Sequence, residues 1–345
     1  MKRGTTAAPH RRLHNRFLAL AALAVTTTLL VAGCAAPTPS EDTGGEDKVV
    51  LGIIGFSAAD ATLNKTAEAV VALAEENGWE TDYQAANPAG DASSANSIMQ
   101  VMLEKGATMI MTLAFDTDLL GSGIAAAQAK GVPVLAMSSG KLSPGVVWAS
   151  DVGYVPDMGA QIEADFADAE KVQVLNMTYL LATPGQGRNK LVQEVAANDP
   201  KFVLTDKEVP IPGAVQGGRD FTAAWLAANP PTEGVELAIY AVFDQPAEGA
   251  VAALRQVDRT DVKIYSYDAT PAGLALVKEG YIVANVQNGR ALQAAQAIEA
   301  AERVVSGALT LDNPEIVPAA FFIVTTANVE QYEIDFPAAF TDEGV

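Results

Sequence analysis

Short apolar runs alternate along the chain with longer stretches in which apolar residues recur every three or four positions. Residues 49–54 form the first run, and Leu63, Ala67 and Val70 begin the first helical repeat. A continuous apolar run is typical of a parallel strand buried on both faces, and the longer spacing is typical of an amphipathic helix. The pattern therefore predicts strands that alternate with helices.

This alternation stops after residue 137, where a further strand follows directly, and then resumes, so the chain contains two similar halves. Strands are expected at residues 49–54, 79–85, 108–113, 132–137, 145–149, 172–177, 202–209, 236–242, 262–267, 281–286 and 316–324. Helices are expected at residues 63–74, 94–104, 118–130, 156–169, 187–197, 218–228, 247–257, 271–279 and 292–305, with an irregular tail at the end. The sequence thus predicts an α/β fold with two doubly wound parallel sheets and right-handed crossovers.

The first 33 residues have the pattern of an export signal. A basic start precedes an apolar run at residues 17–31, which at about 15 residues is too short for a comfortable membrane span. Small residues then lead into Cys34, the only cysteine of the chain, and this arrangement resembles a bacterial lipobox, whose cysteine is lipidated. The alternative is an ordinary signal peptide with a chance cysteine. Residues 34–47 are small, polar and rich in Pro and Gly, which predicts a flexible linker.

Charge and composition exclude several classes of function. The chain has a formal net charge of −20, and its leader contains only basic charges, so the remainder is more acidic still and repels nucleic acid. Both histidines, His10 and His14, lie in the leader. Without them the exported part has no Ser-His-Asp triad, no Cys-His pair and no His/Cys zinc site, and we expect neither a metal nor a cofactor.

One glycine pattern resembles a dinucleotide-binding motif. Residues 121–126 match G-x-G-x-x-A, but they lie inside a predicted helix and well after the end of the preceding strand. Phosphate binding requires the tight turn directly after a strand, so we interpret these glycines as helix-packing residues. The chain contains no Walker A motif and no G-x-S-x-G elbow.

Aromatic and hydrogen-bonding residues recur together where the predicted strands end. Open α/β sheets bind ligands at these carboxyl ends, where an aromatic ring can cover a sugar while polar side chains bind its hydroxyls. The alternative is that each acid caps a helix and each aromatic ring fills the core. The candidate ligand residues selected at strand ends are Phe56, Ser57, Phe115, Asp116, Ser139, Phe243, Asp244, Asp268, Gln287 and Asn288.

Four of the candidates are charged, and their sequence contexts differ. Asp268, just ahead of a proline that opens the next helix, is the best single candidate, and Asp244 has a similar context. Arg188 lies in a Gly-rich stretch, where its guanidinium offers a fork of donors to a polyol or a carboxylate, or forms a surface salt bridge. Residues 116–118 lack the longer ligand series of a calcium loop, so capping is the better interpretation of Asp116.

The chain resembles the type I periplasmic binding proteins of the ribose- and galactose-binding kind. The resemblance runs from about residue 48 to residue 332. It rests on the motifs at residues 52–55, 114–118, 131–135, 149–151, 243–250 and 267–271. It implies two lobes joined by a three-segment hinge, with crossings near Asp151, Asn288 and Val317. The implied lobes are residues 48–150 plus 289–317 and residues 151–288 plus 318–345.

The resemblance also implies which residues bind a ligand. Asp116, Arg188, Phe243, Asp244, Asp268 and the Gln287-Asn288 pair fall at or beside ligand positions of the family. The register of Arg188 and the choice between Gln287 and Asn288 stay open. The loop after residue 56 lacks the family's Asn and paired phenylalanines, and Ser138-Ser139 replaces an Asp-Arg pair. These departures leave room for a ligand other than a free pentose or hexose.

We therefore expect a monomeric lipoprotein, not an enzyme, that captures a small polar ligand, a sugar or sugar derivative, by cleft closure and delivers it to an ABC permease. It would be exported and anchored by its lipid to the outer face of the cytoplasmic membrane. Two alternatives are kept, a sensory module that presents its ligand to a membrane receptor and a glycosidase that uses Asp244 and Asp268.

Overall fold

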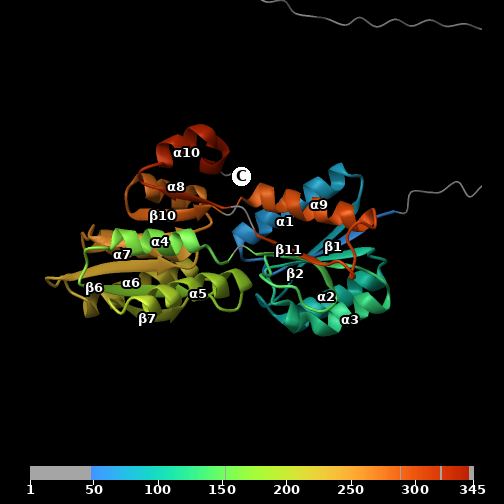
Figure 1. The fold of residues 1–345 in the computed structure, drawn as a ribbon, viewed down its shortest axis with the longest axis horizontal. Coiled ribbons are helices and arrows are strands. Elements are labelled where there is room, and N and C mark those ends of the chain that lie inside the picture. Colours follow the sequence, from blue (N-terminus) through green and yellow to red (C-terminus); the bar gives the residue numbers. More distant parts are fainter. Residues whose placement is uncertain (1–47, 152, 288, 319–320, 342–345) are drawn as a thin grey trace, which may run out of the picture. The chain divides into compact units, whose positions relative to one another are not determined.

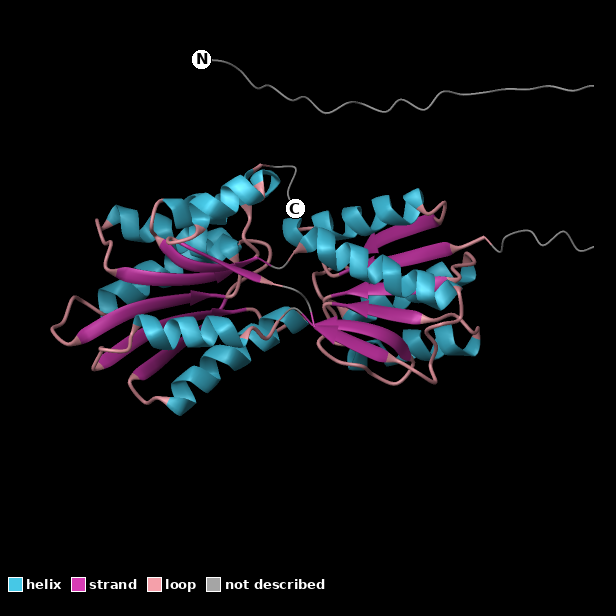
Figure 2. Ribbon diagram, turned by 45° about the horizontal axis from the view of Figure 1, so that its top comes forward, coloured by secondary structure: helices cyan, strands magenta, loops and turns pink. Residues whose placement is uncertain are grey.

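The computed structural model describes residues 48–151, 153–287, 289–318 and 321–341. Two sheets of six strands each carry helices on both faces (Figures 1 and 2). The expected α/β fold with two doubly wound lobes is thereby confirmed. No helix in these ranges combines the length and the hydropathy that crossing a membrane requires.

The first lobe is the sheet with strand order β11-β5-β4-β3-β1-β2, in which all neighbours run parallel. Helices α1 and α9 cover one face and lie side by side, while α2 and α3 cover the other (Figure 1). Its strands are β1 (Val50–Gly55), β2 (Glu80–Ala85), β3 (Met109–Leu113), β4 (Val134–Met137), β5 (Val146–Asp151) and β11 (Glu315–Pro318). Its helices are α1 (Ala61–Glu76), α2 (Ala92–Glu104), the 3₁₀ turn η1 (Thr117–Leu120), α3 (Gly121–Ala129) and α9 (Arg290–Val305).

The second lobe is the sheet with strand order β12-β10-β9-β8-β6-β7, in which only β12 runs antiparallel to its neighbour. Its strands are β6 (Lys171–Thr178), β7 (Phe202–Glu208), β8 (Val235–Ala241), β9 (Val262–Tyr267), β10 (Ile282–Gln287) and β12 (Phe322–Thr325). Its helices are α4 (Pro156–Asp165), α5 (Thr183–Asn198), α6 (Ala214–Ala228), α7 (Asp244–Gln256), α8 (Pro271–Lys278), α10 (Val329–Asp335) and the 3₁₀ turn η2 (Pro337–Phe340).

The chain passes between the two sheets three times. It leaves the first sheet after β5, returns to that lobe between β10 and α9, and leaves it again between β11 and β12. The apolar run at residues 316–324 is therefore not one strand, as expected from its composition, but parts of two strands in different sheets. Pro318 ends β11, and periodicity along the chain does not reveal which sheet a strand joins. The prediction of an irregular tail was also wrong, because this segment contains α10 (Val329–Asp335).

Local sequence explains where the helices that face the site begin. Asp60, Asp91 and Thr270 cap α1, α2 and α8 by accepting a hydrogen bond from the third backbone N–H that follows. The G-x-G-x-x-A stretch lies at the start of α3, where a Cβ on Gly123 would lie 2.8 Å from Met99 Sδ. The interpretation of this motif as helix packing is confirmed.

Candidate functional site

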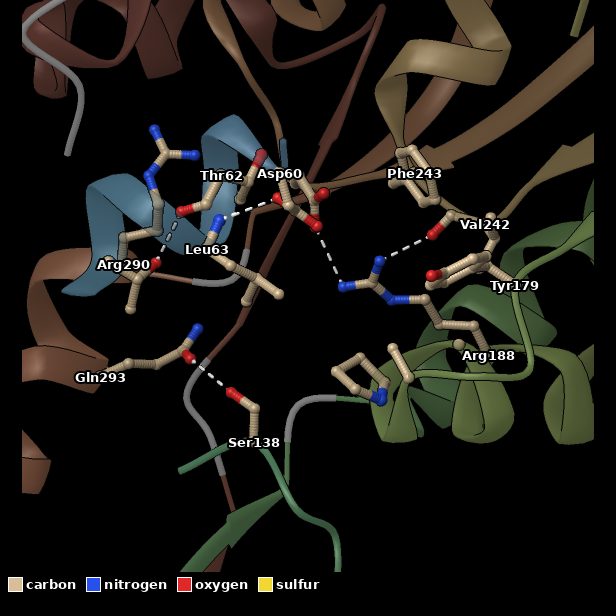
Figure 3. Close-up of a pocket in the computed structure, with 15 residues that line it drawn as sticks. Asp60, Thr62, Leu63, Ser138, Tyr179, Arg188, Val242, Phe243, Arg290 and Gln293 are labelled. Atoms are coloured by element: carbon tan, nitrogen blue, oxygen red, sulfur yellow. Dashed lines mark hydrogen bonds and ion pairs between the residues drawn. The ribbon is translucent and has the colours of Figure 1, made fainter. Parts of the chain in front are cut away.

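A cavity lies where strands of both sheets reach their carboxyl ends, the edge at which open α/β sheets bind ligands. We call it the first cavity, and Figure 3 shows its lining. It is lined by Asp60, Thr62, Leu63, Thr66, Ser138, Tyr179, Ala182, Pro184, Gly185, Arg188, Val242, Phe243, Asp268, Arg290 and Gln293.

Arg188, in the second turn of α5, is the most constrained charged group of the first cavity. Its side chain is 6% exposed, and it donates to the carbonyl oxygen of Val242 at 2.6 Å and to Asp268 Oδ1 at 3.0 Å (Figure 3). The guanidinium also lies 4.6 Å from the centre of the Tyr267 ring. Its Nε, which is buried, has no hydrogen-bond partner among the described residues. These contacts fix the guanidinium so that its planar fork is oriented before a ligand arrives.

Asp268 follows β9 in an uncommon backbone conformation. Its φ is +91° and that of Ala269 is +43°, a backbone region that residues other than glycine seldom adopt. Asp268 N donates to Val286 O at 2.8 Å, and Ala269 N donates to Asn285 Oδ1 at 3.0 Å. Strand β10 therefore holds the turn that presents the Asp268 carboxylate to Arg188.

Asp244 supports this turn instead of facing the ligand. It is fully buried, and its two oxygens accept four hydrogen bonds, from Ser266 Oγ, Asn285 Nδ2, Thr270 N and Thr270 Oγ1, at 2.7–2.8 Å. Burial, reinforced by the charge of Asp268, raises its pKa to about 6, against the lowering effect of these hydrogen bonds. With both oxygens occupied by the protein, Asp244 acts as a positioning residue.

Asp60 brings a second carboxylate to the first cavity from the first lobe. As the cap of α1 it accepts from Leu63 N at 3.0 Å (Figure 3). Burial raises its pKa to about 6, the charge of Asp268 adds to the shift, and the Leu63 N–H and Arg188 oppose it. Asp60 and Asp268 thus belong to one electrostatic group, although they come from different lobes.

Aromatic rings lie along one side of the first cavity. Tyr179 packs edge-on against Phe243 at 6.4 Å and against Phe56 at 6.0 Å, and Phe56 in turn contacts Phe115 at 5.3 Å. Burial raises the pKa of Tyr179 to about 12, so its hydroxyl keeps its proton. Tyr179 and Phe243 line the first cavity, whereas Phe56 and Phe115 are buried beside it.

The structure brings only some of the sequence-selected residues to the first cavity. Arg188, Phe243 and Asp268 line it. Asp116 instead caps η1 and pairs with Lys141. Three further side chains bond to nearby backbone, since Ser57 Oγ accepts from Ala59 N, Ser139 Oγ donates to Lys141 O, and Gln287 Oε1 accepts from Gly289 N. Cys34 and Asn288 lie outside the described residues.

Sequence reasoning did not select Asp60, Arg290 and Gln293. Asp60 stands directly before a helical repeat, which is also the context of an ordinary cap. Arg290 and Gln293 lie one turn apart at the start of α9, and Gln293 Oε1 accepts from Ser138 Oγ at 3.4 Å (Figure 3). Two features of the sequence could have identified Arg290 and Gln293: the polar face of α9 and the position of this helix directly after β10.

The sequence matches the model of a known protein family. The model of the periplasmic binding protein domain matches residues 51–309, which is most of the chain. The chain belongs to the periplasmic binding protein family.

Relatives of this periplasmic binding protein are themselves binding proteins. A xylitol-binding protein of Mycolicibacterium smegmatis is 27% identical over 275 residues, which cover 76% of this chain and 73% of that protein. The ribose import binding protein RbsB of Salmonella typhimurium is 24% identical over 225 residues, which cover 64% of this chain and 72% of that one.

A similar fold is seen in solved structures. A solute-binding protein of an ABC transporter from Agrobacterium vitis, with bound allitol, has a TM-score of 0.72 at 21% identity, over 84% of this chain and 100% of that one. One from Bacillus halodurans with bound myo-inositol has a TM-score of 0.70 at 19% identity, over 85% and 99%. At these identities the likeness concerns the fold.

Proposed function

We propose that this periplasmic binding protein captures a polyhydroxylated ligand, a sugar or a polyol, in the first cavity and delivers it to an ABC importer. The observation that carries the proposal is the Asp60–Arg188–Asp268 group, in which a fixed guanidinium pairs with Asp268 and lines the same cavity as Asp60 from the other lobe. The names of the relatives, which include binders of xylitol and ribose, support it.

The chemistry of the first cavity suits hydroxyl groups. A hydroxyl donates one hydrogen bond and accepts others, so neighbouring hydroxyls can donate to Asp60 and Asp268 and accept from Arg188. Hydrogen bonds to charged groups are worth about 1.5–3 kcal/mol each, and they fix direction. Phe243 and Tyr179 offer ring surface for the C–H side of such a ligand.

We propose binding without catalysis. A glycosidase needs two carboxyl groups free to reach the scissile bond, and the oxygens of Asp244 already accept four hydrogen bonds from protein donors. Asp244 is therefore not available as the catalytic partner of Asp268 that the glycosidase hypothesis names.

Export and anchoring are part of the same proposal. Lipidation at Cys34 would hold a monomeric binding protein at the outer face of the cytoplasmic membrane, with residues 34–47 as its tether. We keep the lobe limits at residues 150/151, 288/289 and 317/318 as a proposal, which the sheet membership of β5, β10, β11 and β12 supports to within one residue, since Asp151 and Pro318 still pair in the first sheet. Labelling of the expressed protein with a radioactive fatty acid, against Cys34→Ala, tests the anchor.

Calorimetry on the exported part of the chain tests the function. Xylitol, allitol, myo-inositol and D-ribose are titrated in turn, and the heat of binding is compared with that of Arg188→Met. We expect micromolar binding, about −8 kcal/mol, of at least one of them, and its loss in the variant. Absence of binding to every sugar and polyol, or turnover of a bound sugar, would contradict the proposal.

A further inference from the structure

A second cavity adjoins the first on the side of α7 and α8. It shares Thr62, Phe243, Asp268 and Arg290 with the first cavity. The rest of its lining comes from Lys65 on α1, from Asp244, Gln245 and Glu248 on α7, and from residues 270–272 at the start of α8. The two cavities therefore adjoin at side chains that face both.

Arg290 is a buried cation that the described protein leaves without a hydrogen bond. Its side chain lines both cavities and is 8% exposed, yet no hydrogen bond or ion pair to its guanidinium occurs among the residues that the structure describes. Figure 3 shows the guanidinium pointing away from Ser138 and Gln293. Its donors therefore face the cavities, where the hydroxyls of a bound ligand can accept from them.

Glu248 is the complementary group of the second cavity. It is half-buried on α7 and has no hydrogen bond or ion pair within the described ranges. Burial, with the charge of Asp244 adding to it, raises its pKa to about 7, so near neutral pH the carboxyl both accepts and donates. The second cavity thus combines an unused donor fork with an unused carboxyl group.

We propose that the second cavity is a subsite for a second polyhydroxylated unit, so that the preferred ligand is a disaccharide or a glycoside whose first unit fills the first cavity. This inference rests on the proposed function and narrows it. Hydroxyls match both unused groups, because they accept from Arg290 and donate to Glu248. A phosphate or carboxylate could pair with Arg290 and Lys65, but it would be opposed by Asp244, Asp268 and Glu248, which line the same space.

Matched ligand pairs test the subsite. Calorimetry compares each single unit with a two-unit ligand that contains it: D-galactose with melibiose, D-xylose with xylobiose, and myo-inositol with galactinol. We expect one two-unit ligand to bind about tenfold or more tightly than its single unit, as two further hydrogen bonds with one charged partner would give.

Ala272→Trp is designed to fill the second cavity from its exposed edge. Ala272 is exposed on α8 and lines the second cavity only, and Ala275, exposed on the same helix outside both cavities, gives the matched control Ala275→Trp. The first variant should remove the advantage of the two-unit ligand and keep the affinity for its single unit, and the control should change neither. In addition, Glu248→Leu should reduce the advantage in affinity of the two-unit ligand over its single unit, whereas Glu248→Gln, which can still hydrogen-bond, should keep most of this advantage.

The outcomes separate the two proposals. Equal or weaker binding of every two-unit ligand, with binding of at least one single unit, overturns the subsite and leaves the proposed function intact. Equal loss of single-unit and two-unit binding in Ala272→Trp also overturns it, because the second cavity is then only the mouth of the first. Absence of binding to all six compounds overturns the subsite, and if xylitol, allitol and D-ribose do not bind either, the proposed function is contradicted as well.

Discussion

Arg188 and Asp268 form a buried ion pair within the second lobe, and Asp268 stands in a turn with positive φ. Removing one partner of such a pair leaves the other charge buried and uncompensated, and this costs more free energy of unfolding than the intact pair contributes. Substitution of Asp268 therefore affects folding as well as binding, and the choice of replacement decides whether the two effects can be separated.

Asp268→Asn keeps the shape of the side chain and suits the positive φ, because asparagine tolerates the left-handed region. We expect ligand affinity to fall by about tenfold or more, since a charge-assisted hydrogen bond becomes a neutral one. The unfolding free energy of the ligand-free protein should fall by about 1–3 kcal/mol. Calorimetry and urea unfolding measure the two effects.

The matched control for this variant is Asp258→Asn. Asp258 also has a positive φ, +52°, but it is exposed at the end of α7 and lines neither cavity. Asp258→Asn should change neither the ligand affinity nor the unfolding free energy. Unchanged ligand affinity in Asp268→Asn would show that Asp268 does not contact the ligand.

Asp60 makes the stability of the ligand-free protein depend on pH. Its pKa is raised from 3.8 to about 6, so the folded state holds the proton more tightly than the unfolded state. The stabilisation is complete below pH 3.8 and is lost as the pH rises through about 6, by at most about 3 kcal/mol, reduced further by solvent screening.

Asp60→Asn should therefore gain stability relative to the unsubstituted protein as the pH rises from 4 to 7, because the amide keeps the cap and carries no buried charge. Urea unfolding at several pH values measures this. Asp91→Asn, which changes the cap of α2 outside both cavities, is the control. A constant difference between Asp60→Asn and the unsubstituted protein across this range would contradict the assignment.

Individual site residues were predictable only where a strand end and a distinctive side chain coincide. Phe243 and Asp268 meet that condition. Phe56 and Phe115 meet it too, but their rings pack into the core, and a sequence does not distinguish a buried ring from one that lines a cavity. Arg290 lay beyond prediction because its role depends on where α9 begins relative to the cavities.

Helices α6 and α7 cross so closely that glycines form their contact. A Cβ on Gly249 would lie 2.0 Å from Val215 O, and one on Gly218 would lie 2.2 Å from Pro246 O. Helix α7 also begins with Asp244, so a shift of this helix disturbs the support of Asp268.

Gly249→Ala should therefore lower the unfolding free energy by about 1–3 kcal/mol, the usual cost of overpacking, and weaken ligand binding. The control is Gly121→Ala in the first turn of α3, where a Cβ would meet nothing within 4 Å. That substitution should be neutral or stabilise by up to about 1 kcal/mol. Equal stability of the two variants in urea would show that the α6–α7 contact relaxes without cost.

Element type was predictable from periodicity, and element limits depended on contacts that periodicity does not contain. Helix α5 begins at Thr183, four residues before its predicted start, because Gly185 and Gly187 pack inside it against Tyr179 O and Gly153. The same glycines suggested a loop in the sequence. Arg188 consequently lies in the helix, with its side chain aimed at β8 and β9.

The two lobes meet through few hydrogen bonds, and Thr183 makes two of them. Its Oγ1 donates to Ser138 O at 2.5 Å, and its N–H donates to Ala114 O at 3.3 Å, so the start of α5 joins the ends of β3 and β4. These contacts exist only while the lobes are together, whereas the cores of the lobes do not depend on them. A ligand that favours the closed arrangement is therefore helped by Thr183 without contact with it.

Thr183→Val removes the Oγ1 donor and keeps the shape of the side chain. We expect ligand affinity to fall by about three- to tenfold, mainly through faster dissociation, while the unfolding free energy of each lobe stays nearly unchanged. Stopped-flow fluorescence and calorimetry measure the two effects. Thr222→Val is the control, because the Thr222 hydroxyl is buried in α6 without a hydrogen-bond partner among the described residues. Unchanged dissociation in Thr183→Val would mean that ligand contacts alone hold the lobes together.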